Sequence, residues 1–172
     1  RMIRDVLVYP NKILREVSKD VTSFDTSLHN LLTDMYDTMV FKEGIGLAAI
    51  QIGIPLNVLI INLVDEEGIQ KIENLYEIIN PVIIEKDGLT TYQEGCLSVP
   101  GYYDEVERAE EIKLRFHDRN GILHEKEFTD LMAIAVQHEM DHLNGRLFIE
   151  KLSYLKRKKF EKEWKKKPKV GK

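Results

Sequence analysis

Residues 129–145 read TDLMAIAVQHEMDHLNG, an apolar run that passes into two histidines and two acidic residues. Thr129 and Asp130 predict the start of a helix over residues 131–144, and Gly145 predicts its end. The first six residues of this helix carry no charge, and a helix that is apolar all round is usually buried. We therefore expect it in the middle of a domain, where histidines and a glutamate destabilise the fold unless they have partners.

The two histidines have the spacing His-Glu-x-x-His, which is typical of metal-binding helices. His138 and His142 are four residues apart, so their rings lie on one side of a helix and can bind the same ion. Glu139 is displaced by about 100° around the helix axis, which places it beside the ion as a group that moves protons. The alternative is a chance match in a solvated helix, and the apolar run before the motif argues against it.

Two histidines leave a catalytic metal one protein ligand short. Many zinc proteases take a downstream histidine or glutamate, and a metalloprotease of that kind stays open here. Cys96 is the better candidate, because a thiolate is a strong ligand for Fe, Zn, Co or Ni. Without other context, however, a lone cysteine is more often a buried apolar residue. The acidic residues after the helix are Glu150, Glu161 and Glu163.

The remaining sequence predicts an α+β fold, with short antiparallel β-sheets around the central metal-binding helix and a helix at the C-terminal end. Asn120-Gly121 is the clearest hairpin turn, and Pro81 should mark a strand edge or a bulge. Residues 44–53 predict a loop that leads into a strand. No repeat or linker interrupts the chain, so we expect one domain over residues 1–172.

The expected elements follow from the spacing of apolar residues and from turn residues. Further helices are predicted at residues 11–17, 25–44 and from about 153 to Pro168. Strands are predicted at residues 58–63, 69–79, 82–85, 106–108, 112–117 and 122–128.

The composition is that of a soluble globular protein, with 43% apolar and 31% charged residues. Cys96 is the single cysteine, which excludes an intrachain disulfide. No apolar run is long enough to span a bilayer, and residues 1–5 contain no apolar signal core. We expect a cytoplasmic monomer that does not associate with membranes.

Charge is unevenly distributed along the chain. Residues 151–172 hold 11 Lys and Arg against 2 Glu, a net +9, whereas the preceding residues hold 14 basic and 27 acidic side chains, a net −13. One interpretation of this basic segment is a solvated helix with Leu155, Phe160 and Trp164 packed on the body. The other is electrostatic contact with ribosomal RNA.

Three motifs occur in a fixed order. Residues 44–51 fit G-x-G-x-A-A-x-Q, residues 94–98 fit E-G-C-x-S, and residues 137–145 fit Q-H-E-x-D-H-x-x-G. Together they resemble the peptide deformylase family, whose members remove the formyl group from nascent bacterial proteins. The likeness runs from about Val6 to about Ser153. A single motif of this kind is a weak signal, and three in order are highly specific.

The resemblance implies one divalent metal, Fe(II) natively, for which Zn, Ni or Co may substitute, with a water or hydroxide in the fourth position. Glu139 is then the general base and later the acid toward the leaving amine. The Gln51 side-chain amide and the Leu97 backbone N–H stabilise the developing oxyanion. The protein ligands implied are Cys96, His138 and His142.

The resemblance also implies that formylmethionyl nascent peptides bind extended beside the backbone of residues 44–46, as an added strand. Gly95 lets the chain pass close to the metal. Glu94 and Asp141 orient ligands or pair with an arginine such as Arg108, and plain ion pairing is at least as plausible. The residues expected at the substrate are Ile45, Gly46, Gly95, Leu131, Ile134 and Ala135, of which the helix residues also suit a core role.

Three functions therefore compete. The first is a metal-dependent hydrolase of formyl amides on nascent peptides, the second a metalloprotease, and the third a catalytically silent metal-binding or ribosome-binding module. Cys96 favours the first over the second, because the protease has no use for it. Glu139 and Gln51 favour the first over the third, since a silent module need not keep both.

Overall fold

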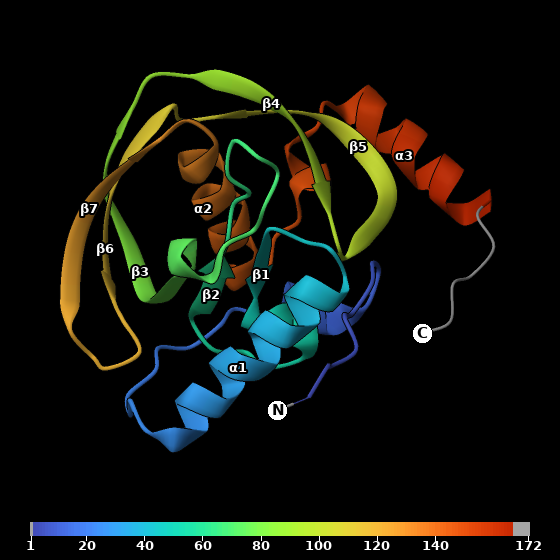
Figure 1. The fold of residues 1–172 in the computed structure, drawn as a ribbon. Helices are drawn as coiled ribbons and strands as arrows, with labels where there is room; N and C mark the ends of the chain where they lie inside the picture. Colours follow the sequence, from blue (N-terminus) through green and yellow to red (C-terminus); the bar gives the residue numbers. More distant parts are fainter. Residues whose placement is uncertain (1, 167–172) are drawn as a thin grey trace.

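Figure 1 shows the computed structural model, which describes residues 2–166. Its α-helices are α1 (Thr26–Phe41), α2 (Asp130–Leu143) and α3 (Tyr154–Lys166). Short 3-10 helices cover Lys12–Arg15, Ala49–Ile52, Ile72–Asn74 and Phe148–Lys151. The strands are β1 (Gly46–Ala48), β2 (Val58–Ile61), β3 (Tyr76–Asp87), β4 (Thr90–Cys96), β5 (Val99–Arg108), β6 (Glu111–His117) and β7 (Leu123–Thr129).

The strands form two antiparallel sheets. The larger has the order β1-β2-β3-β6-β7, and the smaller pairs β4 with β5. In Figure 1, β4 and β5 arch over α2, and α3 lies outside β5. α1 lies on the side of β1 and β2 that is opposite α2. The predicted α+β fold, with antiparallel sheets around a central helix, is confirmed.

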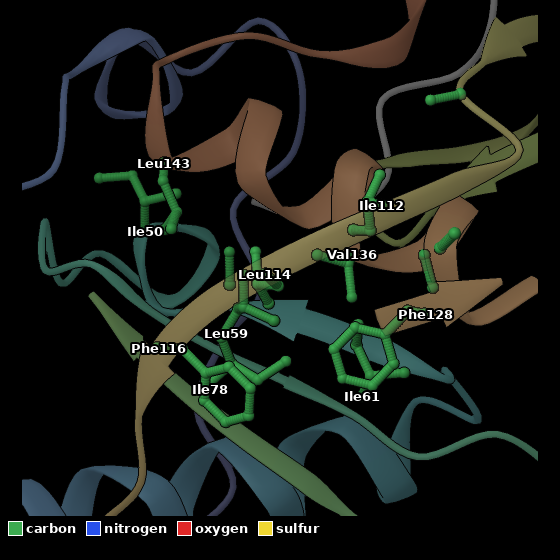
Figure 2. Close-up of a cluster of buried hydrophobic side chains, with 14 residues drawn as sticks. Ile50, Leu59, Ile61, Ile78, Ile112, Leu114, Phe116, Phe128, Val136 and Leu143 are labelled. Carbon is green, nitrogen blue, oxygen red and sulfur yellow. The ribbon is translucent and has the colours of Figure 1, made fainter. Parts of the chain in front are cut away.

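β2 lies at the centre of the fold, with apolar side chains packed on both faces of the sheet. Successive residues of a strand point to opposite sides of the sheet. Leu59 and Ile61 pack in the cluster that includes Val136 of α2, part of which is drawn in Figure 2. Val58 and Ile60 pack in a second cluster with the apolar face of α1. Because both sides are covered, all four residues are buried, and the strand reads as a continuous apolar run.

α2 begins and ends within one residue of its predicted bounds. Thr129 is the N-cap residue, although its hydroxyl makes no capping hydrogen bond. At the other end, Gly145 has φ +73°, and its N–H donates to the His142 carbonyl oxygen at 3.0 Å. A Cβ at this position would collide with the backbone oxygen of Arg15. The glycine is therefore required both by its backbone conformation and by a close approach of the chain.

The helices predicted at residues 11–17 and 25–44 are both shorter in the structure. The Asn11 side chain accepts from the Ile13 N–H at 2.9 Å, as a cap should, but only a 3-10 turn follows. α1 stops before Gly44, and the left-handed residue after it is Glu43, with φ +59°. Gly44 instead packs against Leu97, where an added Cβ would lie 2.8 Å from a methyl carbon and the leucine side chain would have to shift.

Three predicted strand regions differ from the structure. The strand expected from residue 69 begins only at Tyr76, because the exposed Ile69 and Ile72 are three apart and lead into a 3-10 turn. β3 runs through Pro81 with a change of register, which confirms the bulge. Residues 44–53 hold β1 and a 3-10 helix rather than a loop, and β5 is longer than residues 106–108.

α3 is attached to the body through two of its three predicted contacts. The Phe160 ring is fully buried, with its centroid 4.6 Å from that of Tyr102, and the Trp164 ring lies 5.7 Å from that of Tyr9. Leu155 is 79% exposed, so its predicted packing was wrong. Pro168, the predicted end of the helix, lies outside the described residues. Within residues 2–166, no helix has the length and apolarity to cross a membrane.

Candidate active site and metal centre

The three predicted metal ligands come together although Cys96 belongs to β4 and both histidines belong to α2. Cys96 at the end of β4 places its Sγ 3.3 Å from Nε2 of His142 on α2. His138 completes the group: one donor atom from each of the three residues lies within 4.8 Å of the other two. In a tetrahedral site with metal–sulfur and metal–nitrogen bonds of about 2.3 and 2.0 Å, sulfur and nitrogen lie about 3.5 Å apart. The donor set and its spacing therefore fit one divalent ion.

Glu94 fixes the orientation of the His138 ring. Its Oε1 lies 2.8 Å from His138 Nδ1, and a carboxylate only accepts, so this nitrogen carries the proton. Nε2 then carries a lone pair, the form of the ring that suits a metal ligand. Glu94 is itself held by Arg108, whose Nε and Nη2 each donate to one carboxylate oxygen at 2.8 Å. Arg108 Nη1 also donates to Asp141 at 2.6 Å, so the predicted orienting and ion-pairing roles coexist.

The charges of these buried groups are set by their partners. Burial alone would raise the pKa of Glu94, but hydrogen bonds from Arg108 and His138 outweigh it and hold that pKa at about 2. Burial by itself would lower the pKa of His138, but hydrogen bonds to Cys96 and Glu94 raise it. Burial, followed by repulsion from His138, lowers the pKa of His142. A neutral His142 imidazole is the form that a metal requires.

Glu139 is a buried carboxylate that faces the cleft without a fixed partner. Its Oε1 has no hydrogen-bond partner among the described residues. Its Oε2 lies against Gly46, where an added Cβ would come within 2.6 Å. Burial raises the pKa of Glu139 to about 7, which suits a group that both accepts and donates a proton. A divalent cation beside it would favour the ionised form.

The Gln51 amide is oriented by hydrogen bonds at both of its ends. Its Oε1 accepts from the Ala48 N–H at 2.9 Å, so its Nε2 points toward the ligand cluster. Nε2 donates to Ser98 Oγ at 3.0 Å and lies 3.6 Å from Cys96 Sγ. Leu97 follows Cys96 in the two-residue turn between β4 and β5. The structure therefore brings both predicted oxyanion donors beside the ligands.

A cleft of about 660 Å³ opens in front of these groups. Every residue predicted to contact substrate contributes to its wall, and so do Gln51, Leu97 and Glu139. Sequence reasoning missed Tyr92 and Tyr103, whose side chains also line the cleft. The ring of Tyr103 covers Gly95 so closely that a Cβ there would lie 2.7 Å from it. The predicted wall residues are Ile45, Gly46, Gly95, Leu131, Ile134 and Ala135.

The N-terminal segment was also missed as part of the site. The Leu7 N–H donates to the Gln51 carbonyl oxygen at 2.7 Å, and the Tyr9 N–H donates to the Ser98 carbonyl oxygen at 2.8 Å. Val6 and Val8 line the cleft. Only the continuous apolar run of residues 6–9 could have signalled a strand-like role, and nothing in it specifies the partner.

Gln137 has a structural role. Its Oε1 accepts from the Ala109 N–H at 3.1 Å, and its Nε2 donates to the carbonyl oxygens of Ala109 and Ala133 at 2.8 and 3.0 Å. The side chain thereby satisfies backbone groups at the end of β5 and ties that strand to α2.

Replacing Arg108 with lysine should weaken metal binding about tenfold. It should also lower the free energy of unfolding by about 1–3 kcal/mol. Lysine keeps the charge but cannot bind both oxygens of Glu94 and reach Asp141 at the same time. Metal titration and urea unfolding would measure the two effects. Arg115→Lys is the matched control, because Arg115 pairs with Glu125 at an exposed position. Equal losses in both variants would contradict the proposed orienting role.

A buried His-Glu-x-x-His helix with a cysteine beside its two histidines fits a metal-dependent hydrolase with a single-metal site. Residues 3–158 match the family model described as polypeptide deformylase. The chain belongs to the polypeptide deformylase family, and it is therefore an enzyme of the hydrolase class.

The similarity to known peptide deformylases covers nearly the whole chain. A peptide deformylase from Helicobacter pylori (strain G27) is 57% identical over 161 residues, which cover 94% of this chain and 92% of the relative. The crystal structure of a peptide deformylase from Legionella pneumophila is 42% identical, with a TM-score of 0.84 and coverage of 96% and 99%. A peptide deformylase from Ehrlichia chaffeensis in complex with actinonin is 35% identical, with a TM-score of 0.88 and coverage of 99% and 100%.

Proposed function

We propose that this enzyme hydrolyses the formyl amide of N-terminal formylmethionine on nascent polypeptides and releases formate. The observation that supports this most directly is the cluster of Cys96, His138 and His142, of which Cys96 and His138 line the cleft together with Glu139. Membership of the deformylase family supports the substrate class.

Cys96, His138 and His142 would hold one divalent metal, which we propose to be Fe(II), with Zn, Ni or Co able to replace it. When bound, such an ion acidifies a water molecule and polarises a carbonyl oxygen. Metal analysis of protein purified without oxygen would identify the ion. An Fe(II) site with a thiolate ligand should also lose activity in air, by oxidation of the metal or of Cys96.

Residues beside the ligands supply proton transfer and stabilise the charge that develops on the carbonyl oxygen. Glu139 accepts a proton from the attacking water and later donates it to the amine nitrogen that leaves. The new bond joins the water oxygen to the formyl carbon, and the carbon–nitrogen bond breaks, giving formate and a free amino terminus. The Gln51 amide and the Leu97 backbone N–H donate to the carbonyl oxygen as it gains charge.

The methionine side chain would enter the apolar part of the cleft. Leu131, Ile134 and Ala135 lie on successive turns of α2 and line the wall there, and Ile45 faces them from before β1. We propose that Ala135 leaves room for the long methionine side chain. Gly46 and Gly95 also line the cleft, where the absence of a side chain leaves room for Glu139 and for the Tyr103 ring.

Formate release from a formyl-Met peptide tests this function. The wild-type protein should release formate from formyl-Met-Ala-Ser and should leave internal peptide bonds of an unformylated peptide intact. Cleavage of internal bonds without formate release would favour the metalloprotease alternative. Binding of metal without either reaction would favour the silent module.

We further propose that α3 contacts ribosomal RNA near the site where nascent chains emerge. The helix holds Phe160 and Trp164 against the body, while most of its lysines are exposed, so its basic side remains accessible. A chain cut after Ser153 should co-sediment with ribosomes less well at low salt. Because that cut also removes Phe160 from its cluster, Lys158→Glu and Lys162→Glu test the same idea with the packing intact. Unchanged co-sedimentation would contradict the proposal.

We propose a cytoplasmic monomer with one domain over residues 1–172. The action on nascent chains supports the location, and the continuity of α3 with the aromatic cluster at β5 supports the single domain. Size-exclusion chromatography with light scattering would test the monomer.

A further inference from the structure

The backbone of residues 44–46 forms the wall of the cleft on the side of the larger sheet. β1 is the first strand in the order of that sheet, so within the described residues its outer edge has no strand partner. The packing is close on both sides of Ile45. A Cβ on Gly44 would lie 2.8 Å from Leu97, and a Cβ on Gly46 would lie 2.6 Å from Glu139. The position of this segment therefore affects both the strand edge and the reacting groups.

This segment has little means of holding its own conformation. Two of its three residues are glycines, which have the widest range of backbone conformations and no side chain to pack. Ile45, the third, is 38% exposed and lines the cleft. The segment must therefore be held by other parts of the chain.

Gln70 supplies that support from a connection that is distant in sequence. Its Nε2 donates one hydrogen bond to the Gly44 carbonyl oxygen at 3.0 Å and another to the Asn62 carbonyl oxygen at 2.7 Å. The Asn62 N–H in turn donates to the Ile45 carbonyl oxygen at 2.8 Å. One amide group therefore uses both of its N–H bonds to join the glycine segment to the end of β2.

We propose that Gln70 is a positioning residue that fixes residues 44–46 as a preformed edge for the extended peptide. The inference rests on the proposed function for its substrate, but it concerns the residues after methionine rather than the formyl group. An edge held in advance lowers the entropy lost when a peptide adds to it as a strand. The contribution should therefore grow with the length of the peptide.

Gln70→Glu and Gln70→Leu test this role, because both remove the donor while keeping a side chain of similar size. The KM for formyl-Met-Ala-Ser should rise about five- to tenfold, as expected for one or two weakened hydrogen bonds. The kcat should change by less than about threefold, and the KM for formyl-Met alone should change little. Glu66→Gln, at an exposed position in the same connection, is the matched control and should behave as wild type.

Calorimetric binding of the peptide Met-Ala-Ser separates this inference from the proposed function, because binding requires no hydrolysis. Its Kd should rise by the same factor in both Gln70 variants. An unchanged Kd and KM would overturn the inference, as would equal rises in KM for formyl-Met and for the tripeptide. If the wild-type protein bound Met-Ala-Ser but released no formate, the proposed function would fail, and the ratio of Kd values would still decide the role of Gln70.

Discussion

Replacing Glu139 with glutamine should lower kcat for formate release by about 10²- to 10⁴-fold, the range expected for loss of a general acid–base group. Glutamine has nearly the same shape and fits against Gly46, but it cannot accept a proton from water. Because Glu139 lies beside the ligand cluster and is not part of it, bound metal should remain at the wild-type level. Stopped-time formate assays and metal analysis of the same preparation would measure both.

Glu127→Gln is a suitable control for this variant, because Glu127 is an exposed carboxylate on β7. It should leave kcat and metal content unchanged. Formate release undiminished in Glu139→Gln would sink the proposed mechanism. A loss of activity accompanied by loss of metal would show that Glu139 supports the ion rather than the proton transfer.

Replacing Cys96 with alanine should abolish metal retention and, with it, formate release. Loss of a hydrogen-bond partner of a ligand weakens metal binding about 10- to 100-fold, and loss of one ligand in three should exceed that range. The fold should survive, because Cys96 is only partly buried at the end of a strand. Metal analysis after dialysis, together with circular dichroism, would measure the two outcomes.

Cys96→Ser separates ligation from packing. Serine has a similar volume, but its hydroxyl is a much weaker ligand than a thiolate, so this variant should also lose the metal. Full metal content in either variant would refute the ligand assignment. It would instead favour a downstream glutamate as the third ligand and, with it, the metalloprotease alternative.

Much of the site could be predicted from the sequence because its parts are short and local. Because His138 and His142 are four residues apart, their side chains lie on the same face once the helix forms. The apolar residues before them require that the helix be buried. Cys96 was selected by the chemistry of its sulfur and by the motif around it. In the same way, the continuous apolar run in β2 follows from helices on both faces of the sheet.

Other parts depend on long-range contacts that no local pattern specifies. The pairing of Arg108 with Glu94 and Asp141 joins residues 14 and 33 positions apart. Gln70 is a single polar residue in a loop, and its role appears only when its two acceptors are placed beside it. The strand expected from residue 69 failed for a related reason, since an apolar spacing of three suits either a turn or an irregular strand.

The position of Cys96 relative to the two histidines has a consequence for folding. Cys96 belongs to the two-stranded sheet, whereas His138 and His142 belong to the helix packed on the larger sheet. The three donors meet only when these two parts are docked, so an ion that they share would act as a removable cross-link. Its binding free energy would add to the free energy of unfolding in proportion to the logarithm of the ion concentration. Without the ion, the polar links between hairpin and helix would be the Glu94–Arg108–Asp141 contacts, the Glu94–His138 hydrogen bond and the hydrogen bonds of Gln137 to Ala109. Metal supply would then govern the lifetime of this protein in the cell as well as its activity.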